Sequence, residues 1–281
     1  MGALEGKVAL ISGAARGQGR SHAVRLAEEG ADIIALDLCA DVGSVAYPLA
    51  AETDLAETVA AVEATGRRIV SSVTDVRDGA ATAAAVAAGV ADLGRLDVVV
   101  ANAGIVSYYP ADELPPQAWT DMIETNLNGV WNLTSAALRP LIDGGEGGAI
   151  VFVSSSAAHV GLAHLAHYSA AKAGLVGLMQ SLAIELGPHR IRVNTVHPTA
   201  VDTPMVQNEA TYGLFADGGP VEVTPENPPP AIAEGFGNQH ALPTLWVDSN
   251  DVSNAVLFLV AETGRFVTGT QLRVDAGSAA K

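Results

Sequence analysis

The chain has 281 residues, which fits one large α/β domain, and 49% of them are hydrophobic, enough for a sizeable core. Its 15 basic and 31 acidic residues leave a formal net charge of −16, so nucleic-acid phosphates and anionic lipid should repel it. The single cysteine, Cys39, excludes a disulfide within this sequence, and no run of about 18 uncharged apolar residues predicts a membrane span. With no apolar signal segment near Met1, the expected location is the cytoplasm.

Short β-branched runs alternate along the chain with longer alanine-rich segments. The runs predict strands at Val8–Ile11, Asp32–Leu36, Ile69–Val73, Leu96–Val100, Ala149–Val153, Arg190–Val196 and Gln271–Val274. The segments between them predict helices at residues 18–29, 53–64, 78–92, 116–138, 165–186 and 249–261. Several runs are apolar at successive positions, which is typical of parallel strands buried on both faces. We therefore predict one doubly wound α/β domain of the Rossmann type over residues 1–281. It has a seven-stranded, mostly parallel sheet with helices on both faces.

A glycine-rich turn joins the first strand to the first helix. Glycines at 13, 17 and 19 allow a tight turn and a close approach of the backbone to a pyrophosphate. The helix that follows presents free N–H groups and the positive end of its dipole to that anion. The sequence therefore predicts a dinucleotide site here, with Arg16 and Gln18 inside the turn.

The second strand runs into Asp37, 24 residues after Gly13. A carboxylate at this point accepts hydrogen bonds from the adenosine ribose and repels a 2′-phosphate, which favours NAD over NADP. Arg16 favours the opposite choice, but a flexible, exposed cation is weaker than a charge directed at the ribose. The connection that follows, Leu38–Leu49, is longer than a strand-to-helix loop requires.

Tyr168 and Lys172 lie four residues apart in a predicted helix and so share one face. A nearby ammonium stabilises a phenolate, so we expect Lys172 to lower the pKa of Tyr168 and to make it a general base or acid. Ser155 stands 13 residues before Tyr168, where a strand ends. A hydroxyl there can bind the reacting oxygen. Ser154 and Ser156 flank it, and strand alternation directs at least one of them elsewhere.

Residues 204–245 interrupt the regular alternation with a long segment rich in proline, glycine and asparagine. A connection of this length is usually functional or mobile. Its apolar side chains favour a substrate lid with short helices, and a disordered surface insertion is the alternative. These side chains include Met205, Tyr212, Leu214, Phe215, Phe236, Leu242, Leu245 and Trp246.

Together these motifs resemble the short-chain dehydrogenase/reductase family over essentially the whole chain. The residues that carry the resemblance are Ser12-Gly13-x-x-x-Gly17-x-Gly19, Asp75-Val76, Asn102-Ala103-Gly104, Asn126, Ser155 and Tyr168-x-x-x-Lys172. The family implies an NAD-dependent alcohol dehydrogenase or ketone reductase with Asn126, Ser155, Tyr168 and Lys172 as its catalytic set.

The resemblance also implies a role for each further site residue. Asp75 and Val76 would contact adenine beside Leu38, and Asn102, Ala103 and Gly104 would hold the cofactor at the fourth strand. Asn126 would position a water that links Lys172 to solvent, Lys172 would bind the nicotinamide ribose, and Pro198, Val201 and Thr203 would lie at the carboxamide. From the residues alone, an alternative is that Val76 is only a core residue and that Asn102 only braces a turn. Two positions depart from the family pattern, since Ser12 replaces threonine and Thr199 replaces glycine.

A narrower resemblance is to the actinobacterial carveol-dehydrogenase-like subgroup, which is associated with the redox cofactor mycofactocin and holds NAD tightly. It is carried by Asp37-Leu38-Cys39, His197-Pro198-Thr199, Val201 to Met205 and the long insertion. It implies an apolar, terpenoid-like alcohol or ketone as substrate and an external redox acceptor. Family members commonly form homotetramers through the helices at 116–138 and 165–186.

Several alternatives remain open at this point. The same fold could serve as a non-catalytic NAD-binding regulator, although such a protein has little need for all four catalytic residues. An epimerase or dehydratase could use bound NAD without net turnover. Histidines near the predicted site suit substrate contacts, and no carboxylate or cysteine joins them at metal-ligand spacing, so no metal is expected. They are His159, His164, His167 and His197.

Overall fold

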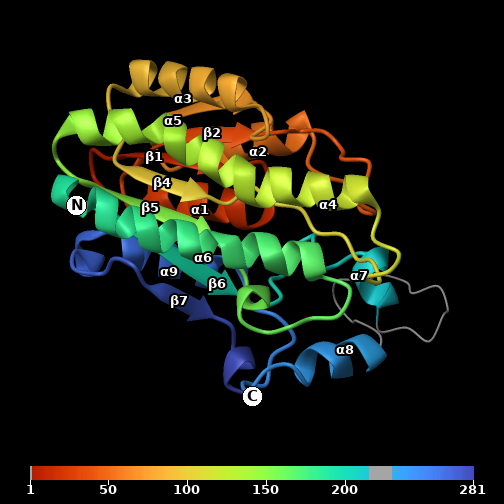
Figure 1. Ribbon diagram of the computed structural model, residues 1–281. Coiled ribbons are helices and arrows are strands. Elements are labelled where there is room, and N and C mark those ends of the chain that lie inside the picture. The colour runs from red at the N-terminus through yellow and green to blue at the C-terminus, as the bar shows by residue number, and fades with distance from the viewer. Residues whose placement is uncertain (1, 215–229) are drawn as a thin grey trace.

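The computed structural model describes residues 2–214 and 230–281, and the strands in this part form one seven-stranded sheet (Figure 1). The strand order is β3-β2-β1-β4-β5-β6-β7, and every paired neighbour is parallel. The sequence predicted each strand to within a few residues, because most of them are short runs rich in apolar and β-branched residues. The strands are β1 Val8–Ser12, β2 Asp32–Asp37, β3 Ile69–Val73, β4 Val98–Ala101, β5 Gly148–Val153, β6 Ile191–Pro198 and β7 Gln271–Val274.

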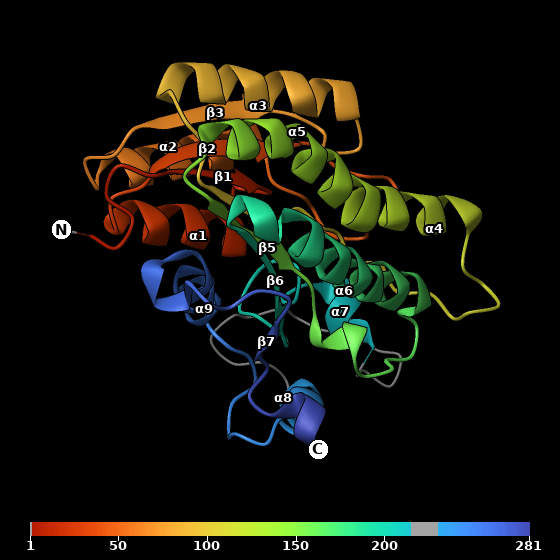
Figure 2. The same cartoon turned by 60° about the vertical axis from the view of Figure 1, so that its left-hand side comes forward.

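Helices cover both faces of the sheet (Figures 1 and 2). On one face Val86, Leu133 and Leu175, from α3, α5 and α6, belong to a core cluster with β1, β4 and β5. On the other face α1, α2 and α9 contribute to a second cluster. The helices are α1 Gly17–Glu28, α2 Glu52–Glu63, α3 Gly79–Leu93, α4 Pro116–Ile123, α5 Gly129–Gly144, α6 Ala166–Leu186, α7 Glu209–Gly213, α8 Pro230–Gly237 and α9 Ser249–Val260.

The first and last long helices, α1 and α9, pack against each other. Between them the buried imidazole of His22 lies with Nδ1 2.8 Å from the Ser253 hydroxyl, and Ser21 Oγ lies 2.7 Å from the same oxygen. These contacts join segments more than 200 residues apart in the sequence.

One predicted helix is wrong in its extent. The single helix expected over 116–138 is instead α4, a π-helical turn at Glu124–Asn128, and α5, which continues to Gly144. A π turn inserts an extra residue per turn and has no clear sequence pattern. Proline inside a helix is disfavoured, but α5 accommodates Pro140 and ends at Gly144, with Gly145 as its C-cap at φ +69°.

The predicted insertion over 204–245 is described in part. Its described residues form α7 and α8, and residues 215–229, with Phe215, lie outside the described part. No helix among the described residues combines the length and hydropathy needed to cross a bilayer.

Candidate active site

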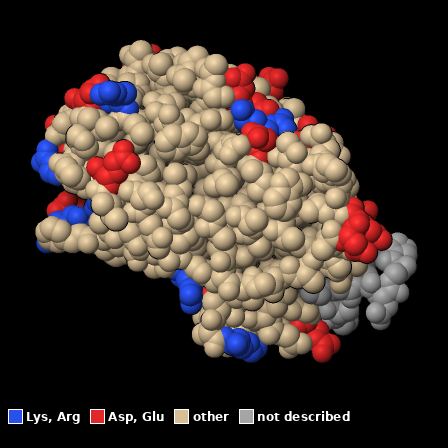
Figure 3. All heavy atoms as spheres, in the orientation of Figure 1, with Lys and Arg blue, Asp and Glu red and all other residues tan. Residues whose placement is uncertain are grey.

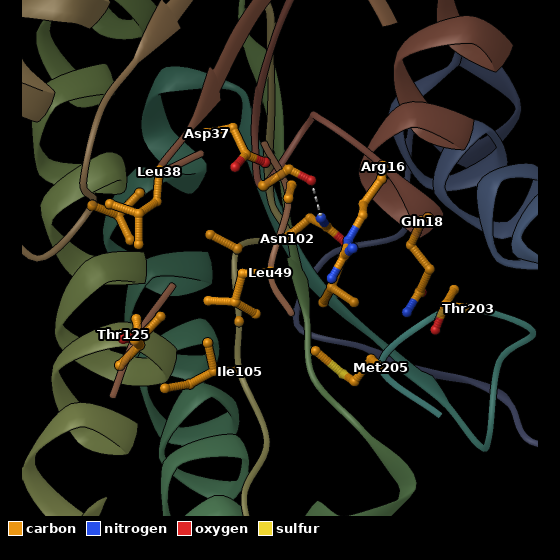
Figure 4. Close-up of a pocket in the computed structure, with 18 of the residues that line it drawn as sticks. Arg16, Gln18, Asp37, Leu38, Leu49, Asn102, Ile105, Thr125, Thr203 and Met205 are labelled. Carbon is orange, nitrogen blue, oxygen red and sulfur yellow. Dashed lines mark hydrogen bonds between the residues drawn. The ribbon is translucent and has the colours of Figure 1, made fainter. Parts of the chain in front are cut away.

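The carboxyl ends of β1, β2 and β4 border a cleft, at the point where the strand order reverses between β1 and β4 (Figure 4). Most residues predicted to bind a dinucleotide line this cleft. They are Gly13, Arg16, Gly17, Gln18, Asp37, Leu38, Asp75, Val76, Asn102, Ala103, Gly104 and Thr203, together with Tyr168 and Lys172. Five predicted residues lie outside its lining, namely Gly19, Asn126, Ser155, Pro198 and Val201.

The glycine-rich turn leaves no room for side chains at two of its positions. Gly13 has φ +64°, and a Cβ there would lie 2.8 Å from the Ala103 Cα atom. A Cβ on Gly19 would lie 1.8 Å from the Gly13 carbonyl oxygen. Arg16 is the extended N-cap residue of α1 and makes no side-chain cap, so the first-turn N–H groups of α1 remain available to an anion. These features fit the pyrophosphate of a dinucleotide.

Asn102 braces the turn while it also lines the cleft. Its Nδ2 donates to the Ser12 and Gly13 carbonyl oxygens, each at 3.1 Å, and the bond to Gly13 is the dashed line in Figure 4. The Ser12 hydroxyl accepts from the backbone N–H groups of Asn102 at 3.2 Å and Ala103 at 3.1 Å. Serine at position 12 therefore supplies the same hydroxyl as the family's usual threonine.

Asp37 is held at the end of β2 by two backbone donors. Its Oδ2 accepts from Ala15 N–H at 2.9 Å and its Oδ1 from Cys39 N–H at 3.0 Å. Arg16 forms no ion pair with this carboxylate among the described residues, and its Nη2 donates instead to the Pro48 carbonyl oxygen at 2.5 Å. The charge of Asp37 is thus left for a ribose, which favours NAD over NADP.

Asp75 and Val76 follow β3 and form the opposite wall. The Asp75 carboxylate pairs with the Arg77 guanidinium at 2.6 Å, and its pKa is lowered because the Arg77 hydrogen bonds outweigh the cost of its partial burial. Val76 is buried, and a Cβ on Gly129 would lie 2.6 Å from its Cγ2 atom. Val76 therefore belongs both to the core and to the cleft.

The long connection after β2 lies along the cleft, and we call residues 38–51 the strap. Its Val42, Tyr47 and Leu49 line the cleft. Val42 belongs to an apolar cluster with Ile105, and Tyr47 to one that also contains Tyr168. Sequence reasoning noted the length of this segment but assigned none of these three residues to the site. The length of the segment, too long for a simple turn, was the available signal.

Tyr168 stands near the start of α6, beside the end of β5. Its phenol hydrogen-bonds the Ser155 side chain, whose Oγ also accepts from Ala157 N–H at 3.1 Å. Ser154 points elsewhere, since its hydroxyl donates to the Lys172 carbonyl oxygen at 2.9 Å. Ser155 is thus the serine beside the phenol. Burial raises the pKa of Tyr168 to about 12, and the Ser155 hydrogen bond offsets only part of that rise.

Lys172 lies one helical turn after Tyr168, with Nζ 5.7 Å from the centre of the phenol ring. The ammonium is buried and donates to the Val153 carbonyl oxygen at 2.9 Å. Burial lowers the pKa of Lys172 to about 8. We expected Lys172 to lower the pKa of Tyr168, but desolvation dominates both groups in this structure.

The depressed pKa of Lys172 makes stability depend on pH. The unfolded chain holds the lysine proton up to about pH 10.4, whereas the folded protein releases it near pH 8, so stability should rise with pH between these values. Lys172→Met removes the buried charge, and we expect it to raise the free energy of unfolding by about 1–3 kcal/mol at pH 7.

Urea unfolding at pH 7 and pH 9.5 measures this effect. Between these pH values the free energy of unfolding should rise less in Lys172→Met than in wild type. Arg68→Met is the matched control, because it removes a cation on an exposed side chain and should keep the wild-type rise. A Lys172→Met variant that is less stable than wild type at pH 7 would contradict the expectation.

Asn126 sits in the π-helical turn and is buried. Its Oδ1 accepts from Ile105 N–H and its Nδ2 donates to the Ile105 carbonyl oxygen, both at 2.8 Å. A Cβ on Gly104 would lie 3.2 Å from Asn126 Oδ1 and 3.4 Å from Lys172 Nζ. Asn126 and Lys172 thus approach the same backbone position at the end of β4.

The segment after β6 closes the far side of the cleft. A Cβ on Gly17 would lie 3.2 Å from Thr203 Cγ2, so Thr203 borders the phosphate-binding turn. Val201 is buried and forms an isolated parallel bridge with Val247. Pro198 ends β6.

The four histidines predicted near the site lie in different contacts. His197 is buried, places Nδ1 3.0 Å from the Ser155 carbonyl oxygen, and packs 4.5 Å from His159 between ring centres. His167 Nε2 lies 2.9 Å from the Ser107 hydroxyl, and the His164 carbonyl accepts from Tyr109 N–H. In the described part of the chain, no group of three or more His, Cys, Asp or Glu residues could hold a metal ion.

Comparison with known proteins agrees with this geometry. The family model described as short chain dehydrogenase matches residues 7–212. The chain belongs to the short-chain dehydrogenase family. Within the family it is 50% identical, over 100% of both chains, to (−)-trans-carveol dehydrogenase of Rhodococcus erythropolis.

Two solved structures of short-chain dehydrogenases share the whole fold. A carveol dehydrogenase of Mycobacterium avium in complex with NAD is 49% identical, covers 100% of both chains and superposes with a TM-score of 0.96. A short chain dehydrogenase of Mycobacterium paratuberculosis bound to NAD is 41% identical, also over 100% of both chains, with a TM-score of 0.90.

Proposed function

We propose that this protein is an NAD-dependent dehydrogenase that interconverts apolar secondary alcohols of the carveol type and their ketones. The observation that carries the proposal is the placement of Tyr168, Ser155 and Lys172 beside a cleft with a glycine-rich phosphate turn and a fixed Asp37. The carveol dehydrogenase relatives support both the cofactor and the substrate class.

In this proposal bound NAD would supply the acceptor for the hydride of the alcohol carbon. Tyr168 accepts the hydroxyl proton of the alcohol, or returns it during reduction. Ser155 Oγ already accepts from Ala157 N–H, so its own proton is available to the reacting oxygen or to Tyr168. Lys172 holds the ribose and supplies positive charge, and Asn126 positions a water that links Lys172 to solvent.

The remaining predicted residues bind the cofactor. The backbone around Gly13, Gly17, Gln18 and Gly19 holds the pyrophosphate, and Asp37 holds the adenosine ribose. Leu38, Asp75 and Val76 would hold the adenine, beside Asn102, Ala103 and Gly104, and all six line the cleft. Pro198, Val201 and Thr203 would hold the carboxamide, and Arg16 holds the strap through the Pro48 carbonyl oxygen.

The proposal also covers the oligomeric state of the protein and its location in the cell. The surface over α5 and α6 carries few charged side chains (Figure 3), and it exposes Trp131 at 44% and Ile184 at 82%. Such a face supports a homotetramer in which these helices pack against symmetry mates. We further propose one domain over residues 1–281, a cytoplasmic location, and an external acceptor of the mycofactocin type for reducing equivalents.

An anaerobic assay tests the proposed function. Purified protein is incubated with cyclic terpenoid and aliphatic secondary alcohols, with added NAD or NADP, and with or without an artificial electron acceptor. We expect reduced nicotinamide to form with NAD and cyclic alcohols, and at least about 100-fold less efficiently with NADP, because Asp37 repels the 2′-phosphate.

Three other results of this assay would each change the proposal. Reduction of only one bound equivalent, continuing only with the acceptor, would identify a cofactor that does not exchange. Conversion of the alcohol without any reduced nicotinamide, even with the acceptor, would favour an epimerase or dehydratase. A protein that binds NAD but turns over no alcohol would favour a non-catalytic regulator.

A further inference from the structure

The described parts of the insertion, residues 204–214 and 230–246, form a small packed unit that we call the α7–α8 module. Tyr212 of α7 and Phe236 of α8 are both buried in one apolar cluster, with Leu245 packed against it. The Phe236 ring also meets Trp246 edge-on, with 6.3 Å between the ring centres. Packing between the two helices therefore makes them move as one body.

The module is tied to strand β6 through a buried histidine. His240 follows α8 and is only 2% exposed. Its Nε2 lies 2.7 Å from the Thr199 hydroxyl and its Nδ1 lies 2.8 Å from the Thr244 carbonyl oxygen. The Lys281 ammonium donates to the His240 carbonyl oxygen at 2.9 Å.

The hydrogen-bond partners determine the tautomer of His240. The Thr244 carbonyl can only accept, so Nδ1 must carry a proton. In the neutral imidazole Nε2 is then an acceptor, and the Thr199 hydroxyl donates to it. A valine at position 199 would leave this buried nitrogen without its donor, whereas a serine would keep the hydroxyl.

Thr199 stands directly after β6 and outside the lining of the cleft. It follows Pro198 at the end of β6, and its backbone N–H donates to the Val274 carbonyl oxygen at 3.2 Å. The Thr199 hydroxyl thus joins the end of β6 to the α7–α8 module.

The other end of the module reaches the catalytic tyrosine. The Thr211 hydroxyl of α7 lies 3.0 Å from the Tyr108 hydroxyl and 3.3 Å from the Met205 carbonyl oxygen. Tyr108, Met205 and Tyr168 all contribute to one apolar cluster. A shift of His240 would therefore pass through α8 and α7 to the apolar wall beside Tyr168.

We propose that Thr199 and His240 form a latch that positions the α7–α8 module, and that this position sets the fit of bulky apolar alcohols at Tyr168. The substrate half of this inference rests on the proposed alcohol dehydrogenase function. Thr199 and His240 are positioning residues. The KM for a small alcohol that does not reach the module should therefore not depend on them.

The test compares Thr199→Val with Thr199→Ser in the full-length protein. Hydrogen exchange, measured without substrate, should show at least about five-fold faster exchange for the amides of residues 237–246 in Thr199→Val. Thr199→Ser should match wild type. With carveol, KM should rise about five- to ten-fold in Thr199→Val, while kcat, the KM for propan-2-ol and the affinity for NAD stay within about two-fold.

A double-mutant cycle with His240→Leu isolates the contribution of the pair. If the two residues act through one bond, the effects of the two substitutions on amide exchange and on the KM for carveol should be less than additive. Unchanged exchange in Thr199→Val, or an equal effect of Thr199→Ser, would overturn the latch. An equal rise in KM for propan-2-ol and carveol would overturn its role in specificity. A wild-type protein that oxidises no alcohol would overturn the proposed function, and the exchange result would still decide the latch.

Discussion

Tyr168→Phe is expected to lower kcat for alcohol oxidation by about 10²- to 10⁴-fold while the protein still binds NAD. The phenol is the group beside Ser155 that can exchange a proton with the reacting oxygen, and phenylalanine keeps the ring that packs in the strap cluster. The change thus removes the hydroxyl and keeps the packing of the ring in the cluster that contains Tyr47. Steady-state kinetics and NAD titration by calorimetry measure the two properties separately.

Tyr109→Phe is the matched control for this variant. Tyr109 precedes α4, and its ring lies edge-on to His167, 6.3 Å between ring centres. Its hydroxyl has no part in the proposed reaction, so kcat should stay within about two-fold of wild type. If Tyr168→Phe kept more than a tenth of the wild-type kcat, another group would have to carry the proton.

Gly19→Ala should abolish measurable NAD binding under conditions that saturate wild type. A Cβ at this position would lie 1.8 Å from the Gly13 carbonyl oxygen and 2.9 Å from the Ala14 Cα atom. Both are backbone atoms, so the turn itself has to move away from α1. Overpacking of this kind also costs about 1–3 kcal/mol of folding free energy.

Gly144→Ala provides the comparison for Gly19→Ala, since Gly144 lies in the last turn of α5 and a Cβ there meets nothing within 4 Å. NAD affinity and stability should both match wild type. Thermal unfolding with and without NAD reports on both quantities, because a bound ligand raises the melting temperature. A Gly19→Ala protein with the wild-type NAD-dependent rise in melting temperature would show that the turn tolerates a side chain.

The sheet could be predicted because its central strands are buried on both faces. Runs such as Val8–Ser12 are apolar at every position but the last and are bounded by glycine-rich turns, so their ends are visible in the sequence. The break between α4 and α5 could not be predicted in this way. It depends on the two hydrogen bonds between Asn126 and Ile105, which are 21 residues apart.

The site residues also differ in whether local sequence or a long-range contact places them. Gly13, Asp37 and Tyr168 belong to motifs in which each residue is placed by its own strand or helix, and local spacing predicts them. Tyr47 reaches the cleft only because the strap folds back over it, and a contact of that kind leaves no periodic pattern. The raised pKa of Tyr168 could not be predicted from the sequence either, because it depends on the burial of the phenol in the folded protein.

The contact between His22 and Ser253 has a consequence for synthesis of the chain. The phosphate-binding helix α1 emerges from the ribosome early, but its partner α9 ends only at Val260. Until then the imidazole of His22 and the apolar face of α1 have no partner there. The nascent chain therefore exposes this face of α1 for most of translation, and this is the interval in which chaperones have a surface to bind.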